Sequence, residues 1–148
     1  MPEPSNQEYG KGYFLIANPV LPDPNFSRTV VLLCNHDDEG SFGLVINRSA
    51  PIDAKEVFAE MGMTEFPSGK IYLGGPVSPS QVFYLCHSEE PLPELESICE
   101  DVYLGMSWEL LDNLMTRVKN PKKNIRFYLG YSGWGARQLA EEMTRLSW

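Results

Sequence analysis

The sequence has few cysteines, few histidines and few basic residues, and it has no long hydrophobic run. Its three cysteines are an odd number in a chain without a recognisable export signal, which argues against a disulfide framework and predicts reduced thiols. The longest uninterrupted apolar runs, such as Val30–Cys34, are five residues, whereas a membrane-spanning helix needs about 20. The first residues contain neither the basic nor the apolar segment of a secretory signal. We therefore expect a cytoplasmic protein that does not cross a membrane.

Negative charge dominates the chain. Twenty acidic residues against 12 basic ones give a formal net charge of −8. This charge repels phosphate backbones and anionic lipid surfaces, so nucleic acid is disfavoured as a partner. Five basic residues nevertheless cluster around Pro121, between residues 117 and 126. Such a cluster is typical of a solvated helix end, and an acidic partner is the alternative explanation.

Length and composition indicate one folded domain. The chain has 148 residues and a mass of 16.7 kDa, which lies within the size range of a single domain. Hydrophobic residues make up 43% and charged residues 22%, values that exclude a disordered tail and a coiled coil. Residues 1–11 are polar without periodicity and predict a loose tail. The domain is expected to span residues 12–148.

The hydrophobic pattern predicts six or seven strands and three helices. The expected strands are residues 13–17, 29–35, 42–47, 70–73, 81–87, 102–104 and 125–129, and the expected helices are 53–61, 107–118 and 136–146. The second and third strands are apolar along nearly their whole length, which predicts central strands covered on both faces. Hairpin-length turns join some strands and helices join others, so the expected class is α+β with a mixed sheet.

A glycine-rich segment, Gly130–Gly135, lies between a predicted strand and a predicted helix. A Gly-x-Ser-x-Gly turn in this place would expose a nucleophilic serine, but the glycine falls at Gly133, one place early, and no histidine follows Ser132. The glycines instead predict a turn that approaches the sheet closely, with Trp134 filling the space. This turn and Arg137 form a candidate site for an anion or a carboxylate.

Four residues of metal-ligating type lie in two predicted strands: Cys34, His36, Cys86 and His87. Cys34 and His36 share one strand face, but Cys86 and His87 are adjacent and point to opposite faces, so the pattern predicts no four-ligand metal site. A redox pair of Cys34 and Cys86 would require neighbouring strands, and neither cysteine has a basic residue close in sequence to lower its thiol pKa. We expect buried, unreactive thiols, with no metal and no cofactor.

Polar residues gather at the predicted strand ends. Asn18-Pro19 and Asp23–Phe26 connect two apolar strands, and Asn47 closes the third strand. Asn, Asp and Pro form turns, which explains these positions without any ligand. The alternative is a shared pocket, because polar strand ends, a Gly-Gly-Pro loop and a glycine-rich helix entrance commonly build a small-molecule or peptide cleft.

Six sequence blocks occur in order along the chain. They are Gly12–Pro19, Asp23–Phe26, Gly43–Arg48, Gly74–Val77, Leu85–His87, and Gly130–Gly135 followed by Gln138-Leu139. Together they resemble the AlgH/YqgE family of bacterial proteins, over about Gly12 to Trp148. The resemblance implies a single mixed domain in which a bent, bifurcated sheet forms a pseudo-barrel flanked by about three helices.

The resemblance implies little about function. The family is largely uncharacterised, and some members carry a regulator label linked to alginate production without an established DNA-binding fold or reaction. Family members commonly have alanine in place of Ser132 and a Gly-Gln pair in place of Arg137-Gln138, so a nucleophilic Ser132 is disfavoured and an anion site at Arg137 is particular to this chain. Members usually continue beyond the tryptophan that matches Trp148, so we expect this chain to lack their C-terminal extension.

Three functions are compatible with these patterns. The leading hypothesis is a cytoplasmic binding or regulatory protein with a cleft for a small molecule or a protein partner. Its expected ligand-binding residues are Asn18, Asp23, Asn25, Phe26, Asn47, Gly75, Pro76, His87, Tyr131, Trp134 and Gln138. The alternative is an enzyme or redox protein that uses His87 as general base or Cys86 as nucleophile. A transcriptional regulator is third, opposed by the acidic charge and the absence of a helix-turn-helix.

Overall fold

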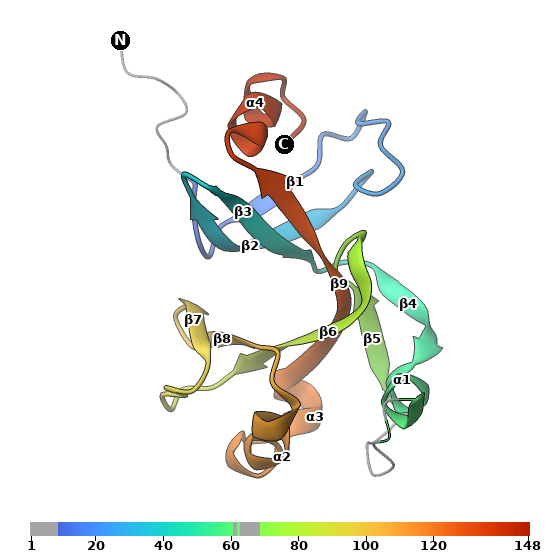
Figure 1. The fold of residues 1–148 in the computed structure, drawn as a ribbon, viewed down its shortest axis with the longest axis vertical. Helices are drawn as coiled ribbons and strands as arrows, with labels where there is room; N and C mark the ends of the chain where they lie inside the picture. The colour runs from blue at the N-terminus through green and yellow to red at the C-terminus, as the bar shows by residue number, and fades with distance from the viewer. Residues whose placement is uncertain (1–8, 61, 63–68) are drawn as a thin grey trace.

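A curled sheet flanked by helices forms the described part of the chain, which comprises residues 9–60, 62 and 69–148 of the computed structural model (Figure 1). The elements are β1 (Phe14–Ile16), β2 (Val30–Asp37), β3 (Gly40–Val45), β4 (Ser49–Asp53), α1 (Ala54–Glu60), β5 (Lys70–Leu73), β6 (Val77–His87), β7 (Glu96–Cys99), β8 (Val102–Gly105), α2 (Trp108–Arg117), α3 (Pro121–Asn124), β9 (Ile125–Gly135) and α4 (Gln138–Thr144). The sheet curls into a half-barrel, so the expected α+β pseudo-barrel is confirmed.

The longest strands hold the two halves of the sheet together. Neighbouring strands follow the order β1-β2-β3-β9-β6-β8-β7, and β5 pairs in parallel with β9 while β4 pairs with β5. The first half of β9 pairs with β5 and β6, and its last residues pair with β3. β9 therefore runs from α3 at one end of the molecule to α4 at the other (Figure 1).

The prediction of a turn at Gly130–Gly135 is wrong, because these residues continue β9. Gly133 pairs with Phe42, and Trp134 pairs with Ser41 on β3. Only Gly130 has a positive φ, of 72°, at the point where β9 passes from one partner strand to the other. Glycines in this segment let two backbones cross closely instead of reversing the chain.

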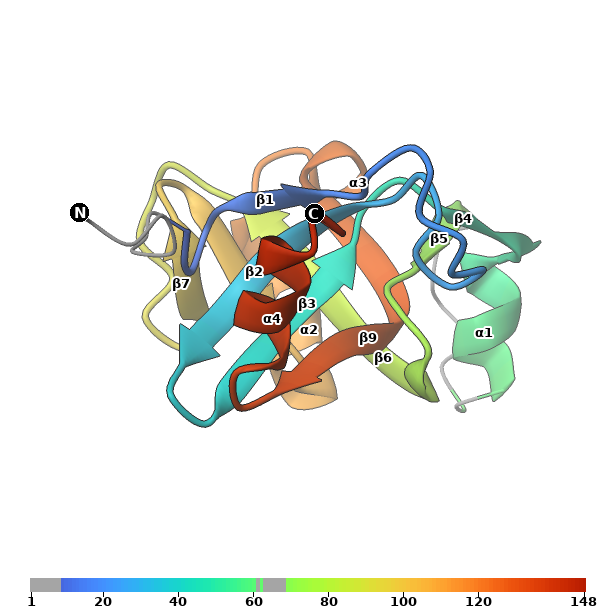
Figure 2. The same cartoon turned by 90° about the horizontal axis from the view of Figure 1, so that it is seen from above.

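Three hydrophobic clusters fill the described core. One lies under α1 and α2 and includes Phe58, Leu111 and Leu114. A second lies under α4 and includes Trp134 and Leu139. The third lies within the curl of the sheet, where residues of β2, β3, β6, β7 and β9 meet. Figure 2 shows α4 over β2 and β3, and α1 beside β4 and β5.

The sequence pattern located most elements and missed three short ones. As predicted, β2 and β3 lie inside the sheet, and four consecutive residues of β2, Val31–Cys34, are buried. β4, β7 and α3 were not expected, because each is mostly exposed and carries no continuous hydrophobic pattern. β7 begins at Glu96, between the predicted strands 81–87 and 102–104.

The bounds of α4 differ from the predicted 136–146, since the helix is Gln138–Thr144. α4 begins at Gln138 instead of residue 136, because Arg137 has a left-handed backbone with φ of 67°. The expected last residue of the first helix, Met61, lies outside the described residues. No helix among the described residues is long and apolar enough to span a membrane.

Candidate functional site

Four of the expected ligand-binding residues converge beside α4. Asn18 and Phe26 come from the loop between β1 and β2, Trp134 from the end of β9, and Gln138 from the first turn of α4. Together with Glu142 they contact the side chain of Trp148 and the backbone of the two residues before it. We call this set of five residues, Asn18, Phe26, Trp134, Gln138 and Glu142, the tryptophan cradle.

The half-buried indole ring of Trp148 packs in the cradle. The ring stands edge-on to Phe26, with centroids 5.5 Å apart, and to Trp134, at 5.9 Å. Its Nε1 donates a hydrogen bond to Glu142 Oε1 at 2.8 Å, and Trp134 Nε1 donates to the same oxygen at 2.9 Å. Gln138 Nε2 donates to the other carboxylate oxygen at 3.1 Å, so both oxygens of Glu142 accept hydrogen bonds.

Asn18 binds the backbone that precedes Trp148. Its backbone N–H donates to the carbonyl of Ser147 at 2.8 Å, and its side-chain Nδ2 donates to the carbonyl of Leu146 at 2.9 Å. Leu146 itself is 68% exposed and has a left-handed φ of 60°. The cradle thus recognises one indole and the two carbonyls before it.

Three further expected residues support the loop that carries Phe26. Asp23 Oδ1 accepts the backbone N–H of Asn25 at 2.8 Å, and the Asn25 carbonyl accepts a hydrogen bond from Arg48. Asn47 accepts the Val30 N–H at 2.9 Å and donates to a backbone carbonyl of the same loop at 3.0 Å. Their polar groups are used in turns and loop anchoring, as the turn-forming interpretation of their sequence pattern predicted.

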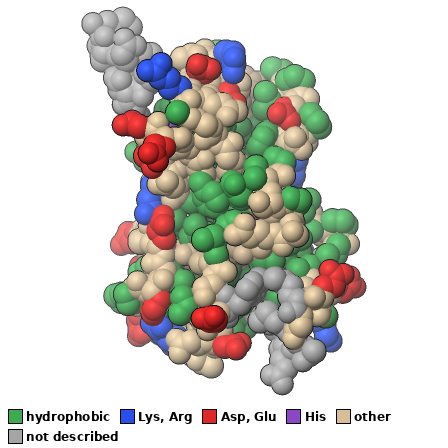
Figure 3. All heavy atoms as spheres, in the orientation of Figure 1, with side chains coloured by type: hydrophobic (Ala, Val, Ile, Leu, Met, Phe, Trp, Pro, Cys, Tyr) green, Lys and Arg blue, Asp and Glu red, His purple; other side chains and the backbone are tan. Residues whose placement is uncertain are grey.

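Gly75, Pro76 and Tyr131 lie at the crossing of β9 with the loop after β5. A Cβ on Gly75 would lie 2.2 Å from the Tyr131 carbonyl, so the two backbones approach closely. The Tyr131 ring packs against Phe42 at 4.8 Å and against Phe83 at 5.8 Å. Figure 3 shows hydrophobic side chains gathered at the middle of the face in view, near the level at which β9 crosses between the two halves.

Ser132, at the same crossing, is fully buried and donates to the Gly74 carbonyl at 3.0 Å. Its hydroxyl therefore ties β9 to the chain after β5, and it is not displayed as a nucleophile would be.

His87 lies away from the cradle, in a hollow of about 250 Å³ between the end of β6 and the loop after α2. Glu90, Arg117, Lys119 and Asn124 are among the residues that line this hollow. Arg117 forms an ion pair with Glu94 at 2.8 Å, and this pairing lowers the pKa of the Glu94 carboxyl. The structure does not bring His87 together with Asn18, Asn47 or Trp134.

The cysteines of the alternative hypothesis are separated and buried. β2 and β6 are not neighbours in the sheet, so the condition for a Cys34–Cys86 redox pair is not met. Both thiols are buried, and burial raises the pKa of each to about 12. A bulge between Leu33 and Asn35 also breaks the regular alternation that was expected to place Cys34 and His36 on one face. No group of three or more potential metal ligands occurs among the described residues.

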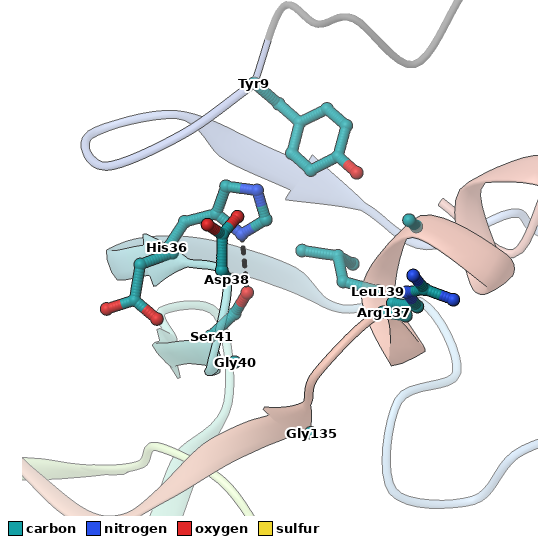
Figure 4. Close-up of a pocket in the computed structure, with 10 residues that line it drawn as sticks. Tyr9, His36, Asp38, Gly40, Ser41, Gly135, Arg137 and Leu139 are labelled. Carbon is teal, nitrogen blue, oxygen red and sulfur yellow. Dashed lines mark hydrogen bonds between the residues drawn. The ribbon is translucent and has the colours of Figure 1, made fainter.

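Sequence reasoning missed a second hollow. It lies beside α4 and has a volume of about 590 Å³. It is lined by Tyr9, His36, Asp37, Asp38, Gly40, Ser41, Gly135, Arg137, Leu139 and Ala140 (Figure 4). We call it the hairpin hollow, because the β2–β3 hairpin supplies half of its wall. The β2–β3 pairing places His36 opposite Ser41, so the hairpin register could have signalled this pair.

Comparison with known proteins identifies the relatives of this chain. A model of the AlgH-like family matches residues 14–148. A UPF0301 protein of Myxococcus xanthus is 42% identical over 137 residues, which cover 90% of this chain and 74% of that protein. A UPF0301 protein of Cytophaga hutchinsonii is 39% identical over 139 residues, covering 93% of this chain and 75% of the relative.

Two solved structures have a similar fold. The solution structure of the AlgH protein from Pseudomonas aeruginosa matches with a TM-score of 0.75 at 31% identity, covering 100% of this chain and 78% of that chain. The crystal structure of a Corynebacterium diphtheriae protein matches with a TM-score of 0.73 at 21% identity, covering 96% of this chain and 75% of the other.

Proposed function

The chain belongs to the AlgH-like family, whose members are uncharacterised, and we propose that this member is a binding protein that recognises a tryptophan-bearing peptide segment in the tryptophan cradle. The observation that carries the proposal is the occupancy of the cradle by residues 146–148 of the chain itself. This segment acts as an internal stand-in for the ligand, since it displays the groups that a partner segment would present.

The contacts of Trp148 define the chemistry of the partner. An indole is required for the N–H that reaches Glu142, and a hydrogen bond to a charged acceptor contributes about 1.5–3 kcal/mol. The edge-on contacts with Phe26 and Trp134 add about 0.5–1.5 kcal/mol for each aromatic pair. The two preceding carbonyls are fixed by Asn18, which makes the recognition depend on backbone and not on the neighbouring side chains.

The internal segment is suited to displacement. Leu146 adopts a left-handed backbone conformation, which costs about 1–2 kcal/mol for a residue with a side chain. Its own side chain is exposed and contributes little burial. A partner segment that makes the same contacts without this strain competes with Trp148, although the tether gives Trp148 an effective concentration on the order of millimolar.

A displacement experiment tests the proposal. The probe is a dye-labelled peptide, Thr-Arg-Leu-Ser-Trp, which copies residues 144–148, and its binding is measured by fluorescence anisotropy. We expect Trp148→Ala to bind the probe about tenfold or more tightly than the unmodified chain, because the tethered indole no longer competes. Adding Glu142→Ala should abolish binding, whereas Glu141→Ala, on the same helix and outside the cradle, should leave it unchanged.

A change in the probe tests the same hydrogen bond without the Glu142 substitution. Replacing the indole of the probe with benzothiophene keeps the ring shape and removes only the N–H donor. We expect this probe to bind Trp148→Ala about tenfold more weakly than the parent probe. Equal binding of the two probes, or equal affinity of the unmodified chain and Trp148→Ala, would contradict the proposal.

The cellular location and the two alternative functions rest on fewer observations. We propose a cytoplasmic location, which the three free cysteines support because a reducing compartment keeps thiols unpaired. His87→Ala in a substrate screen tests the enzyme alternative, since parallel loss of turnover would favour catalysis over binding. A gel shift at two salt concentrations tests the transcriptional regulator, which the net charge of −8 opposes.

A further inference from the structure

The hairpin hollow is a second concave site, separate from the tryptophan cradle. Its volume of about 590 Å³ lies within the range of small-molecule sites, about 300–1,000 Å³. The β2–β3 hairpin forms one wall and the start of α4 forms the other, so two segments far apart in sequence enclose it (Figure 4). Nothing in the proposed peptide recognition uses these residues.

Opposite walls of the hollow carry charges of opposite sign. Figure 4 shows the Arg137 guanidinium on the α4 side and the Asp38 carboxylate on the hairpin side. Among the described residues, the ion pairs are Lys11–Glu96 and Arg117–Glu94, so neither Arg137 nor Asp38 is neutralised by the other. The neighbouring Asp37 differs, because its carboxylate accepts hydrogen bonds from the Glu39 N–H and from Asn35.

Polar groups on the hairpin side of the hollow can orient a ligand. His36 Nδ1 and Ser41 Oγ are 2.6 Å apart, and the Tyr9 ring lies 5.0 Å from the His36 ring. If Ser41 donates to Nδ1, the other ring nitrogen of His36 carries an N–H; if His36 donates, the Ser41 hydroxyl proton is free. Either arrangement leaves one donor for a ligand, and burial raises the pKa of Tyr9, which keeps its hydroxyl a donor as well.

Apolar and backbone surfaces complete the site. Leu139 is buried and Ala140 is half-buried, and both line the hollow behind Arg137. Gly40 and Gly135 add backbone without side chains, which keeps the space between the walls open. Two acidic residues among the lining side chains disfavour a phosphate or a nucleotide, since a polyanion would meet Asp37 and Asp38.

We propose that the hairpin hollow binds a small zwitterion of dipeptide or tripeptide size. Its carboxylate lies on Arg137, its ammonium group on Asp38, and its amide is oriented by the His36–Ser41 pair. Arg137 suits this role because its planar guanidinium can hold a carboxylate through two parallel hydrogen bonds. A zwitterion is the ligand class that satisfies both unpaired charges at once.

Capped peptides test this assignment on the unmodified chain. The probes are Ala-Ala, N-acetyl-Ala-Ala and Ala-Ala-amide. Binding of each probe is measured by calorimetry and by the amide chemical shifts of Gly40, Ser41, Gly135 and Ala140. We expect Ala-Ala to bind and shift these amides, and each cap to weaken binding about tenfold, because each cap removes one charge. None of the probes contains an indole, so failure here leaves the tryptophan cradle untouched.

Two variants identify which charge each residue binds. Arg137→Gln should weaken binding of Ala-Ala and of N-acetyl-Ala-Ala and leave Ala-Ala-amide unaffected, since that probe has no carboxylate. Asp38→Asn should weaken binding of Ala-Ala and of Ala-Ala-amide and leave the acetylated probe unaffected. Arg145→Gln and Asp112→Asn, exposed residues outside the hollow, are the matched controls. Absence of binding at millimolar peptide, affinity that ignores the caps, or variant effects that do not follow them would overturn the proposal.

Discussion

Single amide side chains hold much of the loop structure around the cradle. Asn47 is exposed, yet its Oδ1 accepts the Val30 N–H and its Nδ2 donates to the Arg28 carbonyl, so it closes both ends of one loop–strand junction. Asn18 joins the β1–β2 loop to the segment before Trp148, because its Nδ2 donates to the Leu146 carbonyl. A residue that looks like an ordinary turn former in the sequence thus bridges two parts of the chain.

Replacing Asn47 tests this bridging. We expect Asn47→Ala to lower the free energy of unfolding by about 1–2 kcal/mol, because two hydrogen bonds are lost and the backbone groups remain. Urea denaturation followed by tryptophan fluorescence measures the change. Asn35→Ala, which loses one long contact of 3.4 Å to Asp37, is the matched control and should cost less than half as much. Equal losses in the free energy of unfolding for the two variants would show that the bridging hydrogen bonds of Asn47 add no stability of their own.

The three cysteines should differ sharply in reactivity. Cys99 is exposed, whereas Cys34 and Cys86 are buried with the pKa of each thiol raised to about 12. At pH 7 only about one buried thiol in 10⁵ is a thiolate, the form that reacts. We expect iodoacetamide to modify Cys99 alone in the native protein and all three after denaturation, as measured by mass spectrometry. Rapid native labelling of Cys86 would revive it as a nucleophile.

At the scale of elements, the crossing of β9 with the loop after β5 decides the shape of the sheet. Gly75 has a φ of 155°, and its missing side chain lets the loop backbone lie against Tyr131. Because β9 pairs with β6 and β5 before this point and with β3 after it, the crossing joins the two halves.

Adding one methyl group at the crossing tests its role. We expect Gly75→Ala to destabilise the protein by about 2–4 kcal/mol, since its Cβ would lie 2.2 Å from backbone atoms that cannot move independently. Thermal unfolding measures the loss, and a strong fall in soluble yield would be the extreme form of the same result. Gly10→Ala, where no atom of the described residues lies within 4 Å of the new Cβ, should change stability by less than about 0.5 kcal/mol. Similar values for the two variants would refute this account.

At the scale of the whole molecule, burial of ionisable groups sets the response to alkali. Burial raises the pKa of Cys34, Cys86 and Tyr128 to about 12, above their ordinary values of 9.0 for cysteine and 10.0 for tyrosine. A raised pKa in the folded state means that the unfolded chain loses these protons first. The stability that they contribute is therefore complete below pH 9 and is lost as the pH rises toward 12.

We expect the free energy of unfolding to fall by a few kcal/mol, to order of magnitude, between pH 9 and pH 11. Urea titrations across this range measure the fall. In the double variant Cys34→Ala and Cys86→Ala the slope against pH should be shallower, whatever the absolute stability of the variant. An unchanged slope would show that these thiols do not titrate on unfolding.

The sequence by itself determined the class of the fold and most of its elements. Hydrophobic runs such as Val30–Cys34 and the helical pattern at 108–117 are local properties, and local properties are readable without a fold. The polar positions Asn18 and Asn47 were also located correctly, as loop and strand-end residues. Burial of Cys34 and Cys86 followed from the same apolar runs.

Tertiary structure alone decided which of these residues meet. Trp134 and Trp148 share one carboxylate oxygen of Glu142, and His36 and Arg137 line the same hollow, because β9 is a single strand that carries α4 back over β2 and β3. His87, equally prominent in the sequence, was carried to another hollow by β6. Strand pairing between distant segments depends on the whole chain closing its loops around one core, and no local pattern contains that information.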